Sequence, residues 1–150
     1  MEKQVGKKRH VRFDRDGFGN VMASYRRGGA RVGRAFAAHM DQLAWVRQKN
    51  GEMRFLDSVP ERFLVHPKTK NFGDFAMWDL PPFEVRDRMI HSRACDDLLG
   101  CAEILCLFRE LAPAGAEAHC LGLFTRAAEV GFVGAIEPAR NQIASEHAAT

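Results

Sequence analysis

The widest apolar pattern in the chain covers residues 95–111, CDDLLGCAEILCLFREL. On a helical wheel Asp96, Glu103 and Glu110 form one polar stripe, while apolar side chains occupy most of the remaining circumference. A helix with so wide an apolar surface has to be covered on several sides. The pattern therefore predicts a core helix around which the rest of the chain is arranged.

Alternating apolar and polar residues predict strands in the N-terminal half. Residues 9–13 and 21–26 alternate on either side of a segment rich in turn formers, which predicts a β-hairpin. Two more strands are expected within residues 51–58 and 61–67, and a short one within residues 75–80. Together these segments predict a small antiparallel sheet of about four or five strands.

Other segments have helical spacing. Apolar residues share one face of a helix at 34–49, Pro82 is suited to begin a helix through residues 83–91, and residues 116–129 are rich in alanine. Pro138 is placed to open a last helix. Because strands and helices do not alternate regularly, the predicted fold is α+β: an antiparallel sheet in the N-terminal half, packed with one helix and a C-terminal bundle of three to four helices.

The length and composition predict one folded unit. A chain of 150 residues with 46% hydrophobic residues can bury a core of its own, so residues 1–150 are expected to form a single α+β domain. Residues 1–8 are expected to be a flexible basic arm. No apolar run reaches the length of a membrane span, which predicts a cytoplasmic protein without a membrane partner.

The net charge of +3 conceals a gradient along the chain. Residues 1–34 hold ten Lys or Arg and three Asp or Glu, a net charge of +7, whereas residues 94–150 hold three and eight, a net charge of −5. This asymmetry predicts an anionic partner for the N-terminal end.

The basic region has the composition of an anion-binding surface. Arginines alternate with glycines at residues 26–34, so that backbone N–H groups and guanidinium groups can both approach phosphate, and Tyr25 offers a ring for stacking. The sequence has no recognisable device for reading bases, so binding to DNA or RNA is expected to be non-specific. The residues predicted to contact nucleic acid are Lys7, Lys8, Arg9, Arg12, Tyr25, Arg26, Arg27, Arg31 and Arg34.

The functional hypothesis is a small non-enzymatic protein that binds or regulates a nucleic-acid-handling complex through this basic surface. The alternative is a protein-interaction module, an inhibitor or assembly subunit without direct nucleic-acid contact, in which Trp45 and Trp78 are the anchors. A homo-oligomer is a variant of the alternative, with the acidic half of one copy against the basic loop of another.

Searches for catalytic and metal-binding motifs give no candidate. The four cysteines form no CxxC pair and are expected to be buried free thiols. The turn at residues 14–20 begins like a calcium loop, but Phe18 stands where an oxygen ligand is needed. The six histidines are scattered, and His39 is interpreted as a hydrogen-bonded structural residue. The sequence therefore predicts no catalytic residue, metal or cofactor, and enzymatic activity is left open but not favoured.

Overall fold

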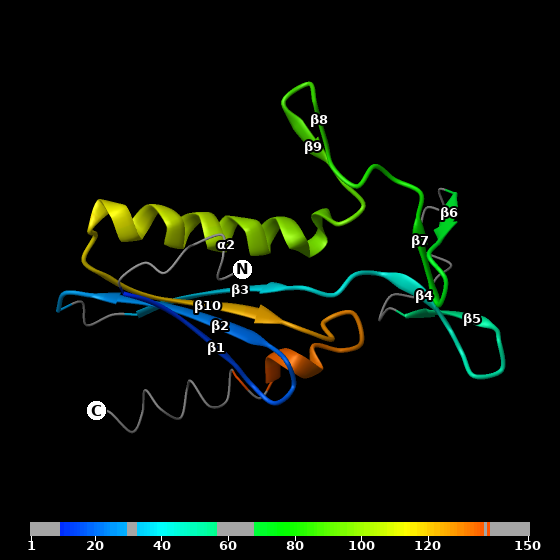
Figure 1. The fold of residues 1–150 in the computed structure, drawn as a ribbon, viewed down its shortest axis with the longest axis horizontal. Helices are drawn as coiled ribbons and strands as arrows, with labels where there is room; N and C mark the ends of the chain where they lie inside the picture. Colours follow the sequence, from blue (N-terminus) through cyan, green and yellow to red (C-terminus); the bar gives the residue numbers. More distant parts are fainter. Residues whose placement is uncertain (1–9, 30–32, 57–67, 137, 139–150) are drawn as a thin grey trace.

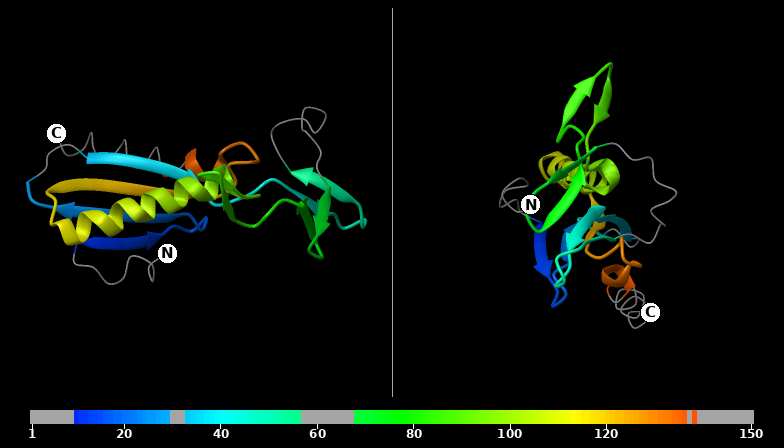
Figure 2. Two further views of the ribbon diagram at one scale, coloured as in Figure 1. Left: turned by 90° about the horizontal axis from the view of Figure 1, so that it is seen from above. Right: turned by 90° about the vertical axis from the view of Figure 1, so that its right-hand side faces the viewer.

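The main body is a four-stranded sheet with one long helix on it. The computed structural model describes residues 10–29, 33–56, 68–136 and 138. The strands run in the order β1-β2-β10-β3, and α2 lies across one face of the sheet (Figures 1 and 2). The elements are β1 (Val11–Arg15), β2 (Val21–Arg27), β3 (Gly33–His39), α2 (Cys95–Ala114) and β10 (Ala118–Thr125).

A second, smaller sheet is inserted between β3 and α2. Its strand order is β5-β4-β7-β6, and a separate hairpin, β8–β9, projects from the connection to α2 (Figure 1). Trp45, Phe55 and Trp78 contact one another on this sheet, with ring centroids 4.7–6.1 Å apart. The elements are β4 (Ala44–Arg47), β5 (Met53–Leu56), β6 (Thr69–Asn71), β7 (Phe75–Trp78), β8 (Glu84–Arg86) and β9 (Met89–His91).

The carboxyl ends of β3 and β10 lie at the same edge of the main sheet. β1 and β2 form an antiparallel hairpin, and β10 pairs antiparallel with β2 but parallel with β3. The last residue of β3, His39, therefore lies opposite the last residue of β10, Thr125. The loops that leave these two strands begin side by side.

The core lies between α2 and the sheet. Cys101, Ile104 and Phe108 are spaced to share one helix face, and all three are buried against the strands. Gly122 of β10 allows this close approach, because a Cβ atom there would lie 2.6 Å from Ile104 Cγ2 and 2.8 Å from Phe108 Cε2. The core is thus a single layer of side chains on one face of the sheet.

Several sequence predictions are confirmed. The hairpin exists as predicted, with Val11 opposite Tyr25, and strands form within the segments that contain β5 and β7. The helix beginning at Cys95 is also present, but it is buried on one face only, and Leu98 is 41% exposed. The expectation that this helix is covered on several sides is therefore wrong.

The predicted C-terminal bundle of three to four helices is wrong. Residues 116–129 contain β10, residues 83–91 form the hairpin β8–β9, and the helix predicted at 34–49 is β3 followed by β4. β10 pairs with β2 and β3, which are distant in the sequence, and β8 pairs with the neighbouring β9. This pairing outweighs the helical spacing of the apolar residues. The described residues beyond β10 are helical at 133–136 and at 138.

The basic arm at residues 1–8, the strand expected at 61–67 and most of the last helix after Pro138 lie outside the described residues. In the part of the chain that is described, no helix is long and apolar enough to cross a membrane.

Candidate functional site

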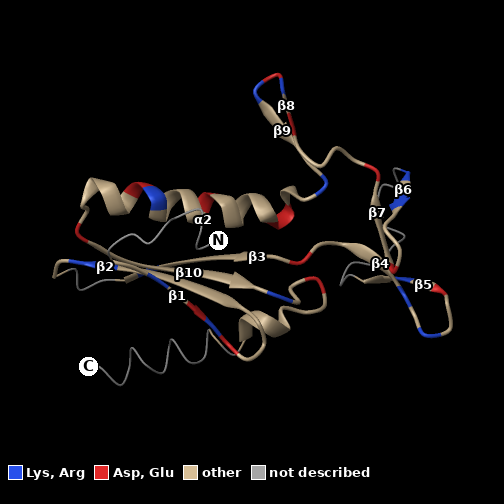
Figure 3. Ribbon diagram, viewed as in Figure 1, with Lys and Arg blue, Asp and Glu red and all other residues tan. Residues whose placement is uncertain are grey.

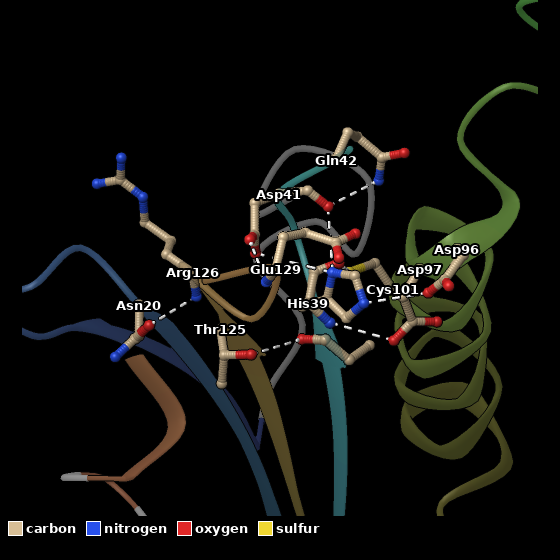
Figure 4. Close-up of polar contacts among 11 residues, drawn as sticks. Asn20, His39, Asp41, Gln42, Asp96, Asp97, Cys101, Thr125, Arg126 and Glu129 are labelled. Atoms are coloured by element: carbon tan, nitrogen blue, oxygen red, sulfur yellow. Dashed lines mark hydrogen bonds and ion pairs between the residues drawn. The ribbon is translucent and has the colours of Figure 1, made fainter. Parts of the chain in front are cut away.

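A cluster of polar side chains lies where β3 and β10 end (Figure 4). His39 is the last residue of β3, Asp41 is in the loop that follows it, and Glu129 is in the loop after β10. Asp96 and Asp97 join them from the start of α2. We call these five residues the polar cluster. Four carboxylates surround one imidazole, so the cluster carries a net negative charge.

His39 is held on three sides by oxygen atoms. Its Nδ1 lies 3.1 Å from the backbone oxygen of Asp41, its Nε2 lies 3.1 Å from Asp96 Oδ1, and its backbone N–H donates to Asp97 Oδ2 at 3.1 Å. A carbonyl and a carboxylate oxygen can only accept hydrogen bonds. The imidazolium form, in which both ring nitrogens donate, satisfies both contacts at once, whereas a neutral tautomer satisfies only one of them.

The electrostatic surroundings of His39 favour the same form. Partial burial lowers its pKa, but the hydrogen bond to the Asp41 backbone oxygen and the charges of Asp41, Glu129 and Asp96 raise it by more. The net effect is that the pKa of His39 lies above its ordinary value.

This shift predicts how stability changes with pH. A folded-state pKa raised above about 6.5, the unfolded value, stabilises the fold fully below that value, and the stabilisation is lost as pH rises through the folded-state pKa. Urea unfolding of the protein and of His39→Gln, measured from pH 5 to 9, should give a stability difference that shrinks across this window. A difference that stays constant with pH would contradict the assignment.

Asp41 connects the two loops of the site. Its Oδ2 accepts a hydrogen bond from the backbone N–H of Glu129 at 3.0 Å, and its Oδ1 lies 3.7 Å from His39 Nδ1. Oδ1 is buried and accepts no hydrogen bond from the described residues. One oxygen therefore fixes the backbone at Glu129, while the other faces the imidazolium.

The loop after β10 is also fixed from the opposite side. Asn20 is 1% exposed; its Oδ1 accepts from the backbone N–H of Arg126 at 2.9 Å and its Nδ2 donates to the Gly134 oxygen at 2.7 Å. Between these contacts Ala127 has a φ of 58°, an uncommon conformation for a residue with a Cβ atom. Such conformations persist where surrounding contacts impose them. These contacts hold Glu129 in place beside Asp41.

Cys101 borders the cluster but is not a nucleophile in this arrangement. Its Sγ donates to the backbone oxygen of His39 at 3.3 Å. Burial and the charge of Asp97 raise the pKa of the Cys101 thiol to about 11, so the thiol stays protonated at neutral pH. All four cysteines are free thiols, but only Cys101 and Cys120 are buried, so the expectation that all four would be buried free thiols is wrong for the exposed Cys106 and the half-buried Cys95.

The cluster contains atoms of the kinds that ligate metal ions. Imidazole nitrogen and carboxylate oxygen are donors that zinc takes, and His39 Nε2 and Asp96 Oδ1 face each other. Within the described ranges, however, no group of three or more His, Cys, Asp or Glu side chains is placed to hold a metal ion. We therefore derive no chemical step through a metal.

The described cations that were predicted to bind nucleic acid do not share one face of the sheet. Lys7, Lys8, Arg9 and Arg31 lie outside the described residues. The register of the main sheet places Arg12 and Arg26 on the face away from α2, whereas Arg27 and Arg34 share the face of the buried Tyr25 and Cys120. In Figure 3 the described cations are spread over both sheets and the hairpin.

The aromatic residues that were predicted to contact a partner pack against other parts of the chain. Tyr25 is fully buried, and its hydroxyl donates to the Ala116 oxygen at 2.7 Å, so its ring has no free face for a base. Trp45 and Trp78 are half-buried and pack edge to face, with centroids 5.6 Å apart. Their role as anchors for a protein partner stays a prediction.

More than half of the chain matches a known protein family. The model of the M42 glutamyl aminopeptidase family matches residues 68–148, more than half of the chain. The chain belongs to the M42 glutamyl aminopeptidase family. The match includes α2, β10 and the cluster residues Asp96, Asp97 and Glu129. No curated protein matched the chain.

Solved structures share the fold of this M42 chain. The PhTET1-12s dodecamer is 18% identical, with a TM-score of 0.59 over 93% of this chain and 57% of that one. The Pyrococcus horikoshii TET1 peptidase, which can assemble into a tetrahedron or a large octahedral shell, is 17% identical, with a TM-score of 0.57 over 89% of this chain and 56% of that one. Aminopeptidase APDkam598 from the archaeon Desulfurococcus kamchatkensis is 19% identical, with a TM-score of 0.66 over 92% of this chain and 52% of that one. The chain therefore spans about half the length of these structures.

Membership of the M42 family corrects the functional hypothesis. A family of aminopeptidases overturns the interpretation of the chain as a non-enzymatic regulator that binds nucleic acid. The dispersed arginines explain the error, because charge counted along a sequence says nothing about the face to which each strand residue points.

Sequence reasoning also missed most of the polar cluster. The sequence pattern assigns Asp96 only to the polar stripe of a helix, and His39 is interpreted as a hydrogen-bonded structural residue. A signal was present at His39 and Asp41, two polar residues that directly follow the small apolar run at 35–38. Interpreting that run as a strand would have placed both residues at a strand end.

Proposed function

We propose that the chain is an aminopeptidase and that the polar cluster is its active site. The observation that carries the proposal is that the five cluster residues meet where two parallel strands end (Figure 4). In sheets with parallel strands, ligands commonly bind outside the carboxyl ends of the strands. Membership of the M42 glutamyl aminopeptidase family supports the proposal independently.

The charge of the cluster suits the amino end of a peptide. Its four carboxylates outnumber the one imidazolium, so the cluster attracts the protonated α-amino group of a substrate. The Asp96 side chain is 83% exposed, and only its Oδ1 has a described contact, with His39. Asp96 is therefore the carboxylate that we assign to the amino group.

The remaining residues divide into a proton acceptor and positioning residues. Figure 4 shows the Glu129 carboxylate beside Asp41 and His39, where it can take a proton from the attacking water as a general base. The hydroxide adds to the carbonyl carbon, the C–N bond of the peptide breaks, and the leaving amine takes up the proton that Glu129 removed from the water. Asp41 and Asp97 act through their neighbours, by fixing the Glu129 backbone and the His39 backbone.

We further propose that the protein is a homo-oligomer. The compared structures include a dodecamer and a peptidase that can form a tetrahedron or an octahedral shell, which supports self-association. The cytoplasmic location remains a prediction from the sequence.

The activity is tested with aminoacyl p-nitroanilides of leucine, phenylalanine, alanine and glutamate. We expect release of p-nitroaniline from substrates with a free amino group in the gel-filtration fractions that contain the chain. The N-acetylated counterparts should not be cleaved, because acetylation removes the positive charge that the carboxylates bind. Assays with and without added Zn²⁺ or Co²⁺ ensure that a metal requirement does not hide activity. Absence of release under every condition, or equal cleavage of acetylated substrates, would reject the proposal.

A further inference from the structure

The two edge strands of the main sheet differ in how well they are protected against pairing with another chain (Figure 2). β1 has five residues, and three of them, Arg12, Asp14 and Arg15, are charged. β3 has seven residues, its residues 33–37 are all exposed, and Arg34 is its only Lys, Arg, Asp or Glu. Short, charged edge strands resist pairing with a further strand, whereas longer ones with few charges favour it. β3 is therefore the edge strand that is open to a partner.

The outer side of β3 presents a row of backbone hydrogen-bonding groups, and no described strand pairs with it. The N–H of Met40 donates toward β10, whereas the N–H of His39 donates to α2 on the outer side. Because successive backbone groups of a strand point to alternate sides, the N–H and C=O groups of Gly33, Ala35 and Ala37 point outward. The His39 end of this side is closed, since α2 binds both backbone groups of that residue.

We infer that the outer side of β3 pairs antiparallel with β3 of a second copy of the chain, so that the two main sheets become one continuous sheet. A two-fold axis at Ala35 places this residue opposite Ala35 of the partner subunit, and Gly33 opposite Ala37 of the partner subunit. Every outward N–H and C=O group of the three residues then finds a partner, because opposite residues exchange both hydrogen bonds. The inference rests on the homo-oligomer proposed above and names its interface.

The side chains of β3 suit this register. Arg34 lies opposite Phe36 of the partner subunit in a closely spaced, non-hydrogen-bonded pair, where a guanidinium group can stack on a phenyl ring. Phe36 is 37% exposed in the single chain, so part of its ring is available for this contact. Arg34 does not lie directly opposite its own copy, which avoids pairing like charges. The strand is thus complementary to itself in charge as well as in hydrogen bonding.

Ala35→Pro removes the central contact of this pairing. Proline has no N–H, and an edge strand accepts it where the N–H faces outward, so the single chain should keep its fold. In the pair, both copies lose the hydrogen bond at the two-fold axis. We expect the dissociation constant of the dimer, measured by sedimentation equilibrium on the full chain, to rise about tenfold or more.

Arg15→Pro is the matched control, on the opposite edge strand. The Arg26 N–H donates to the His10 oxygen, so alternate residues from His10 onward face β2 and the Arg15 N–H faces outward. This variant should associate as the wild type does. Equal dissociation constants for the two proline variants would overturn the inference.

Cysteine variants test the register itself. Ala35→Cys and Ala37→Cys are each made in a chain whose Cys95 and Cys106, the two thiols that are not buried, are replaced by serine. Directly opposite Cα atoms are about 5.5 Å apart, which a disulfide can span, so Ala35→Cys should form a covalent dimer in oxidised glutathione. The two copies of residue 37 are offset by about 13 Å along the strands, so Ala37→Cys should not cross-link.

The outcomes separate this inference from the proposed function. A chain that is monomeric at every concentration would overturn both the homo-oligomer and its interface. An oligomer that survives Ala35→Pro, or equal cross-linking of the two cysteine variants, would overturn the pairing of β3 alone. A covalent dimer of Ala35→Cys but not of Ala37→Cys would support the pairing, whether or not the chain releases p-nitroaniline.

Discussion

Replacing Phe108 with alanine should lower the free energy of unfolding by about 3–5 kcal/mol. Phe108 is completely buried between α2 and the sheet, where its ring lies against the space left by the missing side chain of Gly122. Removing the ring leaves a cavity that the surrounding strands can fill only in part. Equilibrium unfolding in urea, followed by circular dichroism, measures the change.

The matched control for this variant is Phe83→Ala. Phe83 is 66% exposed, so its truncation should change the free energy of unfolding by no more than about 0.5 kcal/mol. Equal stability losses in the two variants would show that the contact between α2 and the sheet is not the core of the fold.

Elements that depend only on neighbouring residues could be predicted from the sequence, whereas elements that depend on distant strands could not. The hairpin β1–β2 could be predicted because its alternation and its turn lie within one short segment. β10 could not, because its neighbours β2 and β3 are distant in the sequence and its residues fit helical spacing equally well. β3 was missed for a related reason: Ala35, Ala37 and Ala38 give too little contrast between its two faces to reveal a strand.

The polar cluster was harder to predict than the strands that carry it. His39 and Glu129 are ninety positions apart, and they meet only because β3 and β10 pair in parallel. The charge gradient, in contrast, was easy to see and misleading. Arg26 and Arg27 are neighbours in sequence, but they point to opposite faces of β2.

The two sheets have different relations to the proposed site. The main sheet and α2 supply every member of the polar cluster, directly or through the loops that leave them. The inserted segment, which runs from β4 to β9, supplies none of these five residues.

Replacing Asp41 with asparagine should reduce kcat/KM at least about 100-fold, a loss typical of impaired proton transfer. The substitution keeps the shape of the side chain but removes the charge that faces His39 and weakens the acceptor that holds the Glu129 N–H. The imidazolium loses a counter-charge, so the pKa of His39 should fall. An NMR titration of the His39 ring reports this fall even where no activity is measured.

Asp74→Asn is the matched control for Asp41→Asn. Its side chain is 96% exposed and lies 3.9 Å from Arg47, beside the second sheet and away from the cluster. The same loss of charge at this position should leave both kcat/KM and the His39 titration as in the wild type. If Asp41→Asn kept wild-type activity and an unchanged His39 pKa, Asp41 would not position the cluster. A lowered pKa with full activity would instead show that the imidazolium form of His39 is not needed for hydrolysis, because the electrostatic link would then be real but without catalytic consequence.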